Sequence, residues 1–224
     1  YTSPHLLDYS ERVRIDGRPA SDEALCASFA EVEQARGDTP LTYFEFGTLA
    51  ALHLFAEASL DLAVLEVGLG GRLDAVNLID ADVSVVTSVG HDHQDWLGES
   101  LEAIAAEKSG IFRPNRPAII GQPDAPERLR QEAERIGAQV MQVGREIGVA
   151  PEPGGGWTWT GPGGEHLVLP APAMRGRVQY HNAAAAIAAL RSLGGRLPLP
   201  VNALRSGLSR AQLRGRFQVI PGDV

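Results

Sequence analysis

The sequence has a single cysteine, Cys26, among 224 residues. That excludes an internal disulfide framework and fits a reducing cytosol, so we expect a cytoplasmic protein. No apolar run approaches the roughly 18 residues of a membrane span, and no membrane association is expected. The chain also lacks an excess of basic residues, because its formal net charge is −8. This balance argues against nonspecific binding to nucleic acid. To bind an anionic substrate, the protein would need local Lys, Arg or a divalent cation to offset its negative charge.

Phosphate-binding motifs are missing as well. No GxxxxGK[ST] string occurs, and the glycine-rich residues 68–72 do not match GxGxxG. By themselves these glycines predict no more than a sharp backbone turn. Hydrophobic residues make up 44% of the chain, which is enough for a sizeable buried core.

What the sequence does contain is an alternation of apolar runs and helix-like segments. Apolar spacing over residues 43–58 predicts a helix, and two more are expected at 100–110 and 126–136. Continuous apolar runs are typical of strands buried on both faces of a parallel sheet. We expect such strands at 62–65, 83–87, 118–120 and 139–143. The alternation predicts an α/β fold with a mostly parallel, doubly wound sheet.

The pattern changes after Gly144. Residues 157–160 and 166–169 alternate around a Gly-Pro-Gly-Gly turn, which predicts a β-hairpin or small antiparallel flap near 145–175. Helices follow at 181–193 and 201–208, and residues 217–220 resemble another strand. The first residues look like the end of a strand entering a loop and carry no initiator Met. We therefore expect the chain to be cut from a larger protein.

Several polar residues follow predicted strands. Glu66 ends one run, His91, Asp92 and His93 follow the next, and Ser3 follows what looks like a strand end. In an open parallel sheet, residues that follow the strands converge at the carboxyl edge of the sheet. A hydroxyl, a carboxylate and an imidazole gathered there suit Mg²⁺. A Ser before Pro is more often a turn or cap, and Glu66 is as well explained as a loop charge. His-x-His is compatible with zinc, but the chain offers no cysteine pair to complete such a site.

Taken together, the segments resemble the folylpolyglutamate synthase and dihydrofolate synthase family of Mur-type ligases. The strings follow the family order: TSPHL at 2–6, ERVRIDG at 11–17, LTYFEFGTLAAL at 41–52, LEVGLGGRLDAVN at 65–77, DHQDWLG at 92–98, EKSGIFR at 107–113, HNAAAAIAAL at 181–190 and GRFQV at 215–219. TYFEFGT favours the folate branch over the cell-wall branch.

The resemblance implies site residues position by position. Ser3 and Glu66 would bind the Mg²⁺ that bridges the ATP phosphates, and His93 a second Mg²⁺. Lys108, which by itself reads as a solvated helix residue, matches a lysine that becomes carbamylated and helps hold the second metal. The implied substrate contacts are Thr42, Tyr43, Phe44, Glu45, Leu73, Asp74 and Ala75, and the implied ATP contacts are Asn182 and Arg216. Position 91 is His where an apolar residue would be unsurprising.

The resemblance also implies the reaction, which is addition of L-glutamate to dihydropteroate or (poly)glutamylated folate at the expense of ATP, through an acyl phosphate. Residues 1–224 would form a partial central ATP-binding domain without the phosphate loop and without the C-terminal glutamate-ligase domain. We expect small-molecule partners only, a monomer, and an inactive isolated chain. Two alternatives stay open: a UDP-muramyl amino-acid ligase of cell-wall synthesis, and a catalytically silent nucleotide-binding fragment.

Overall fold

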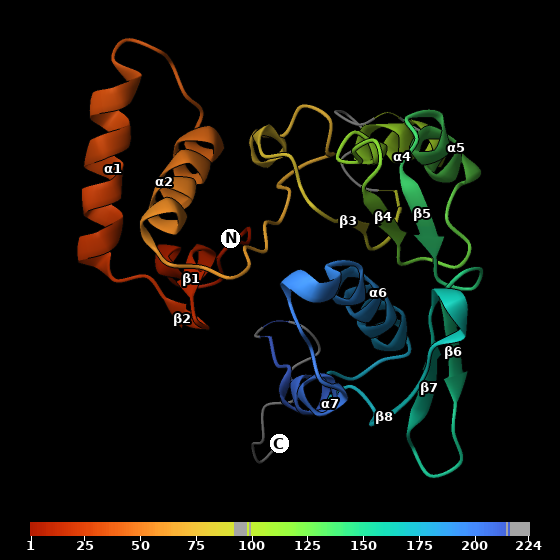
Figure 1. Cartoon of the computed structure of the whole chain (residues 1–224). Helices are drawn as coiled ribbons and strands as arrows, with labels where there is room; N and C mark the ends of the chain where they lie inside the picture. Colours follow the sequence, from red (N-terminus) through yellow and green to blue (C-terminus); the bar gives the residue numbers. More distant parts are fainter. Residues whose placement is uncertain (92–97, 99, 214, 216–224) are drawn as a thin grey trace, which may run out of the picture. The chain divides into compact units, whose positions relative to one another are not determined.

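The computed structural model describes residues 1–91, 98, 100–213 and 215 (Figure 1). The chain divides into two compact units, unit 1 (Tyr1–Ile79) and unit 2 (Asp80–Val224). Within the described residues no helix is both long and apolar enough to cross a membrane.

Unit 1 is built around two packed helices, α1 (Asp22–Arg36) and α2 (Tyr43–Glu57). Short elements surround them: η1 (Tyr9–Arg12), the hairpin of β1 (Arg14–Ile15) with β2 (Arg18–Pro19), and η2 (Ala75–Leu78). Buried Val13, Leu25, Leu54 and Val76 form its core. We predicted α2 but not α1. The signals for α1 were present, namely the N-cap Ser21 and buried Leu25 and Val32 at helical spacing.

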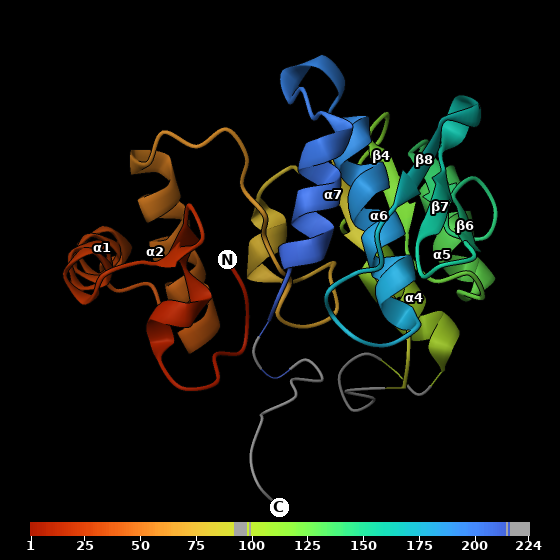
Figure 2. The ribbon, with the colours of Figure 1, turned by 90° about the horizontal axis from the view of Figure 1, so that it is seen from below.

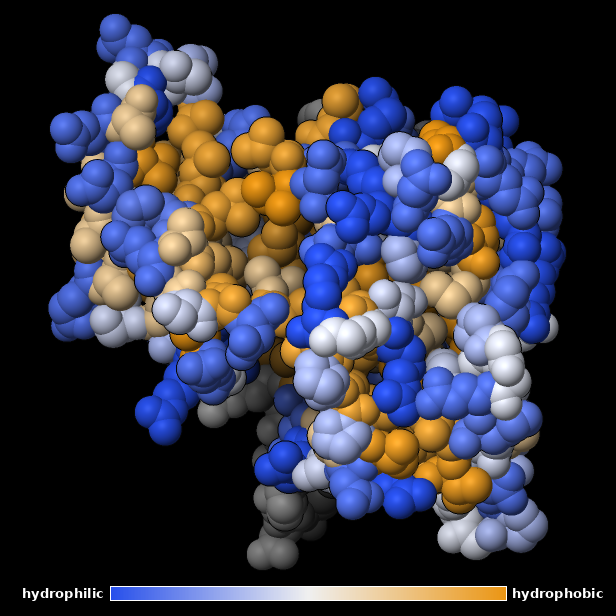
Figure 3. All heavy atoms as spheres, in the orientation of Figure 1, coloured by the Kyte–Doolittle hydropathy of each residue, from blue (hydrophilic) through white to orange (hydrophobic). Residues whose placement is uncertain are grey.

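The prediction of a buried strand at residues 62–65 is wrong for this structure. These residues form no named strand, and Leu62 and Val64 are 40% and 72% exposed. The backbone is paired at a single position: Tyr1 N donates to Val64 O (2.8 Å) and Glu66 N donates to Tyr1 O (3.0 Å). A strand needs a continuous ladder, and one pair is too little to make one. Figure 3 shows apolar side chains at the surface of this unit over α2 and η2.

Unit 2 contains a parallel sheet of β3 (Ser84–Val86), β4 (Pro117–Ile120) and β5 (Gln139–Gln142), in the order β3-β4-β5. Helices cover both faces, with α4 (Leu101–Ser109) and α5 (Glu127–Arg135) on one and α6 (Val178–Ser192) on the other (Figure 1). Side chains of β4 alternate accordingly, since Ile119 packs with α6 while Ala118 and Ile120 pack with α4 and α5. The predicted doubly wound α/β architecture is confirmed.

The small antiparallel sheet has three strands, β6 (Gly148–Pro151), β7 (Trp157–Thr160) and β8 (His166–Leu169), with the turn η3 (Pro162–Gly164) between the last two. We predicted β7 and β8 but not β6. The antiparallel part of the prediction is confirmed. Trp157 and Trp159 are fully buried, and the Trp159 indole donates to Ala184 O of α6 (3.2 Å). The flap is thus anchored to α6.

The end of the described chain continues through η4 (Gly194–Arg196) into α7 (Val201–Arg210). Leu204 of α7 packs in the same cluster as Ala184 and Ile187 of α6, and Figure 2 shows the two helices side by side. The strand-like run predicted at 217–220 lies outside the described residues.

Candidate functional site

Two predicted metal ligands, Ser3 and Glu66, lie together in unit 1. Ser3 N donates to Glu66 Oε2 (3.2 Å), although the two residues are 63 positions apart. The Thr2 hydroxyl donates to the same carboxylate oxygen. Tyr1 hydrogen-bonds to the backbone of Val64 and of Glu66, on either side of Leu65. This pairing brings the residues after Tyr1 next to Glu66.

This donor set fits a hard divalent cation. A carboxylate and a hydroxyl are oxygen ligands, and Mg²⁺ characteristically takes one or two protein ligands and completes its shell with water and substrate phosphates. No group of three or more His, Cys, Asp and Glu side chains suited to a metal occurs among the described residues. The pair therefore suits a metal shared with a nucleotide better than a closed structural site.

The remaining predicted metal ligands belong to unit 2. His93 lies outside the described residues, while His91 is described and exposed. Lys108 lies in the last turn of α4, is half-buried, and is the only lysine in the sequence. Ser100 caps the start of α4 by accepting from Ala103 N (3.1 Å), which agrees with the predicted helix.

The first predicted substrate segment, residues 42–45, begins α2. Thr42 and Glu45 form a capping box, in which Glu45 N donates to Thr42 Oγ1 (3.2 Å) and Thr42 N donates to Glu45 Oε2 (2.7 Å). The Thr42 backbone hydrogen bond lowers the pKa of Glu45. Both side chains are thereby committed to the helix, whereas Tyr43 is 65% exposed and available to a ligand.

The second predicted substrate segment, residues 73–75, is organised by Asp74. Its Oδ2 accepts from Gly68 N (3.0 Å) and Leu69 N (2.9 Å), and its Oδ1 accepts from Val76 N (2.9 Å). Asp74 therefore holds the glycine-rich loop against the start of η2. Leu73 is 80% exposed beside it.

The first segment meets the glycine-rich loop that Asp74 holds in unit 1. The Phe44 ring lies so close to Gly68 that a Cβ at position 68 would come within 2.6 Å of it. The ring of Tyr1 is 6.0 Å from that of Phe44, centroid to centroid. Tyr1 thus links the predicted substrate segment 42–45 to the segment that carries Ser3.

Asn182, the predicted ATP contact, lies in α6 and is half-buried. Its Nδ2 donates to Gln179 Oε1 (3.3 Å) in the same helix. Arg216, the second predicted ATP contact, lies outside the described residues.

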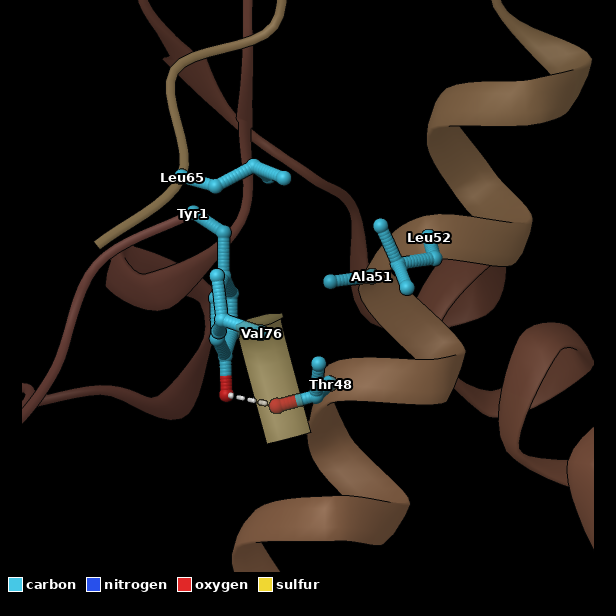
Figure 4. A pocket seen from close by; sticks show the side chains of 6 residues that line it. All are labelled: Tyr1, Thr48, Ala51, Leu52, Leu65 and Val76. Atoms are coloured by element: carbon cyan, nitrogen blue, oxygen red, sulfur yellow. Dashed lines mark hydrogen bonds between the residues drawn. The ribbon is translucent and has the colours of Figure 1, made fainter. Parts of the chain in front are cut away.

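The gap between Tyr1, Leu65, Val76 and α2 is not a ligand site. Its lining is apolar apart from the hydroxyls of Thr48 and Tyr1, which hydrogen-bond at 3.3 Å, as Figure 4 shows. It has no room for even a water molecule. It is a packing seam that fixes Tyr1 against α2.

Thr2 and Arg12 have no predicted role, although they lie in the family strings at 2–6 and 11–17. Arg12 is 92% buried, and its Nε donates to His5 Nδ1 (2.9 Å). Its Cζ lies 5.5 Å from the ring centroid of Tyr9 and 5.4 Å from that of Tyr43. Burial raises the pKa of Tyr9 to about 12. A buried arginine inside a charged string has no local pattern that distinguishes it from an exposed one.

The chain is similar to proteins of known family. Residues 27–190 match the Mur ligase middle domain family. The dihydrofolate synthase/folylpolyglutamate synthase of Escherichia coli K12 is 49% identical over 220 residues, which are 98% of this chain and 50% of that protein. The chain spans about half the length of the curated relatives it matches.

Two solved structures are also similar. E. coli FolC in complex with DHPP and ADP has a TM-score of 0.92 at 49% identity, over 99% of this chain and 52% of that one. A bifunctional folylpolyglutamate synthase/dihydrofolate synthase with Mn, AMPPNP and L-glutamate bound has a TM-score of 0.90 at 47% identity, over 99% and 52%. The resemblance to the folate branch found in the sequence is confirmed, and the chain belongs to the Mur ligase middle domain family.

Proposed function

We propose that this chain is the central ATP-binding part of a ligase that joins L-glutamate to dihydropteroate, to (poly)glutamylated folate, or to both. The observation that carries the proposal is the assembly of unit 1, which joins the Ser3–Glu66 pair through Tyr1 to the segments 42–45 and 68–75. The similar structures bind ADP, AMPPNP, Mn, DHPP and L-glutamate. That range of ligands supports a ligase that uses a nucleotide and a divalent cation.

In this proposal Ser3 and Glu66 hold one Mg²⁺, and His93 with a carbamylated Lys108 holds a second. Asn182 and Arg216 contact the nucleotide. Bound Mg²⁺ would supply positive charge against the phosphates during transfer of the γ-phosphoryl group to the substrate carboxylate. The glutamate amine then attacks the acyl phosphate and phosphate leaves. A positive charge supplied by metals accounts for the handling of anionic substrates by a chain of net charge −8.

On the substrate side, Tyr43 and Leu73 offer exposed aromatic and apolar surface, as a flat heterocycle requires. Phe44 packs against Gly68, and Asp74 holds the glycine-rich loop by accepting from Gly68 N and Leu69 N. The capping box of Thr42 and Glu45 sets the first turn of α2, and with it the direction of Tyr43. Ala75 follows Asp74 at the first position of η2.

The family match is continuous from residue 27 to residue 190 and so includes parts of both units. This supports treating 1–224 as part of one central domain that carries the flap near 145–175. We further propose a monomeric, cytoplasmic parent protein whose partners are small molecules.

The proposal is tested on the full-length protein that contains this chain. ADP release that requires both L-glutamate and dihydropteroate or tetrahydrofolate is expected, with no turnover of a UDP-muramyl peptide. Glu66→Gln should lower kcat at least about 100-fold, since it removes a charge placed to bind metal. Glu31→Gln, on the exposed face of α1, is the matched control and should leave turnover unchanged. Turnover of the muramyl substrate, or full activity of Glu66→Gln, would contradict the proposal.

A further inference from the structure

Thr2 occupies a position set by the backbone pairing of unit 1. Tyr1 N donates to Val64 O (2.8 Å) and Glu66 N donates to Tyr1 O (3.0 Å), which is the parallel pattern that pairs Tyr1 with Leu65. The next residues along the two segments, Thr2 and Glu66, therefore face each other. Residues opposed in this way project their side chains to the same side of the pair.

The hydroxyl of Thr2 is committed to Glu66. It donates to Glu66 Oε2, and Ser3 N donates to the same oxygen (3.2 Å). The Thr2 backbone is itself fixed, because Thr2 N donates to the carbonyl of the buried Arg12 (2.9 Å). Two donors thus converge on Oε2, and none of the described hydrogen bonds of this carboxylate involves Oε1.

We infer that Thr2 is a positioning residue, which fixes the rotation of the Glu66 carboxylate so that Oε1 is presented to the divalent cation. The inference rests on the proposed function, which assigns the cation to Ser3 and Glu66. A hydroxyl that donates to a carboxylate makes a charge-assisted bond, and such outer partners orient a ligand that would otherwise rotate. Threonine suits the task because its β-branched side chain is stiff at χ1.

The test measures metal binding directly in the full-length protein. Free Mn²⁺ is titrated by electron paramagnetic resonance in the presence of AMPPNP, which avoids turnover. Thr2→Val keeps the shape but removes the donor, and should weaken Mn²⁺ binding by about 10- to 100-fold, the range typical of lost outer-shell partners. Thr2→Ser keeps the donor and should bind within about threefold of the wild type, well inside that range.

The flap provides a matched control. Thr158 Oγ1 donates to Glu152 Oε1 (2.6 Å) on the antiparallel sheet, so Thr158→Val removes an equivalent threonine–glutamate bond elsewhere and should leave Mn²⁺ affinity unchanged. Thr2→Ala guards against a folding defect peculiar to valine, and wild-type Mn²⁺ affinity in Thr2→Ala overturns the inference.

Glu66→Gln separates this inference from the proposed function. If Glu66→Gln loses Mn²⁺ while Thr2→Val and Thr2→Ala keep it, the metal site stands and the role of Thr2 is refuted. If Glu66→Gln keeps the wild-type number and affinity of bound Mn²⁺, the assignment of one metal to this pair fails, and the inference fails with it.

Discussion

At the scale of single residues, the proposed second metal site depends on the amine of one side chain, Lys108. It is the only lysine among the 20 Lys and Arg residues of the chain, and the others are arginines. Only a lysine amine can take up CO₂ and become a carbamate, since an arginine guanidinium stays protonated. A carbamate converts a cation that repels Mg²⁺ into an anion that binds it.

We therefore expect Lys108→Ala in the full-length protein to lose most ligase activity without loss of thermal stability. Acetate or formate should restore part of the rate, because a small carboxylate can replace the missing carbamate. The measurement is turnover with and without added acid, and Lys108→Arg serves as the charged control that should not be rescued. An unmodified lysine mass in the active wild type, together with no rescue, would show that Lys108 is a solvated helix residue.

Tyr9 provides a pH-dependent prediction. Burial, followed by the neighbouring Tyr1 and Tyr43, raises its pKa from 10.0 to about 12, while Arg12 acts in the opposite direction. Between these two values the unfolded chain loses the Tyr9 proton and the folded chain keeps it. The contribution of Tyr9 to stability should thus be complete below pH 10 and lost as the pH rises toward 12.

Ultraviolet titration at the phenolate band should show a late step from ionisation of Tyr9. Tyr9→Phe should abolish that late step, and Tyr180→Phe on α6 should leave it in place. Disappearance of the step in the Tyr180 variant alone would refute the assignment.

At the scale of elements, the start of α2 combines two roles that mutation can separate. Thr42 caps the helix, and Tyr43 next to it is exposed and contacts substrate in the proposed function. Thr42→Ala should reduce the free energy of unfolding by about 1 kcal/mol, as the loss of an N-cap usually does. It should also raise KM for the pterin substrate, because the first turn no longer fixes Tyr43.

The matched control is Ser21→Ala, which removes the equivalent cap of α1, where Ser21 Oγ accepts from Ala24 N (3.2 Å). It should cost a similar amount of stability, measured by denaturant titration, and leave KM unchanged. Equal KM effects in the two variants would mean that α2 acts on substrate only through overall stability.

At the scale of the whole molecule, the 224-residue chain is expected to bind MgATP weakly. It contains no GxxxxGK[ST] string to supply backbone amides and a lysine to the phosphates. Calorimetry with MgATP on the isolated chain should show no micromolar binding, and no ADP should be released in the presence of dihydropteroate and L-glutamate. Micromolar affinity would show that the nucleotide site is built from other residues than those proposed.

Local signals were enough to predict the parallel sheet of unit 2 and the helices that cover it. Ser100 and Gly110 delimit α4, and the apolar runs at 83–87, 118–120 and 139–143 became β3, β4 and β5 within one or two residues. These elements depend on caps and on burial at both faces, which a short stretch of sequence records directly. Positions after predicted strands indicated Ser3, Glu66 and the His91–His93 group, and the family strings indicated the other site residues.

Tertiary structure alone decided the rest. The run at 62–65 has the composition of a buried strand, yet it pairs only at Tyr1 and stays largely exposed in unit 1. Thr2 reaches Glu66 across 64 positions, and Ser3 N reaches the same carboxylate across 63. The physical reason is register: a hydrogen bond between distant segments depends on which residues the fold aligns, and no local pattern in the sequence records that alignment.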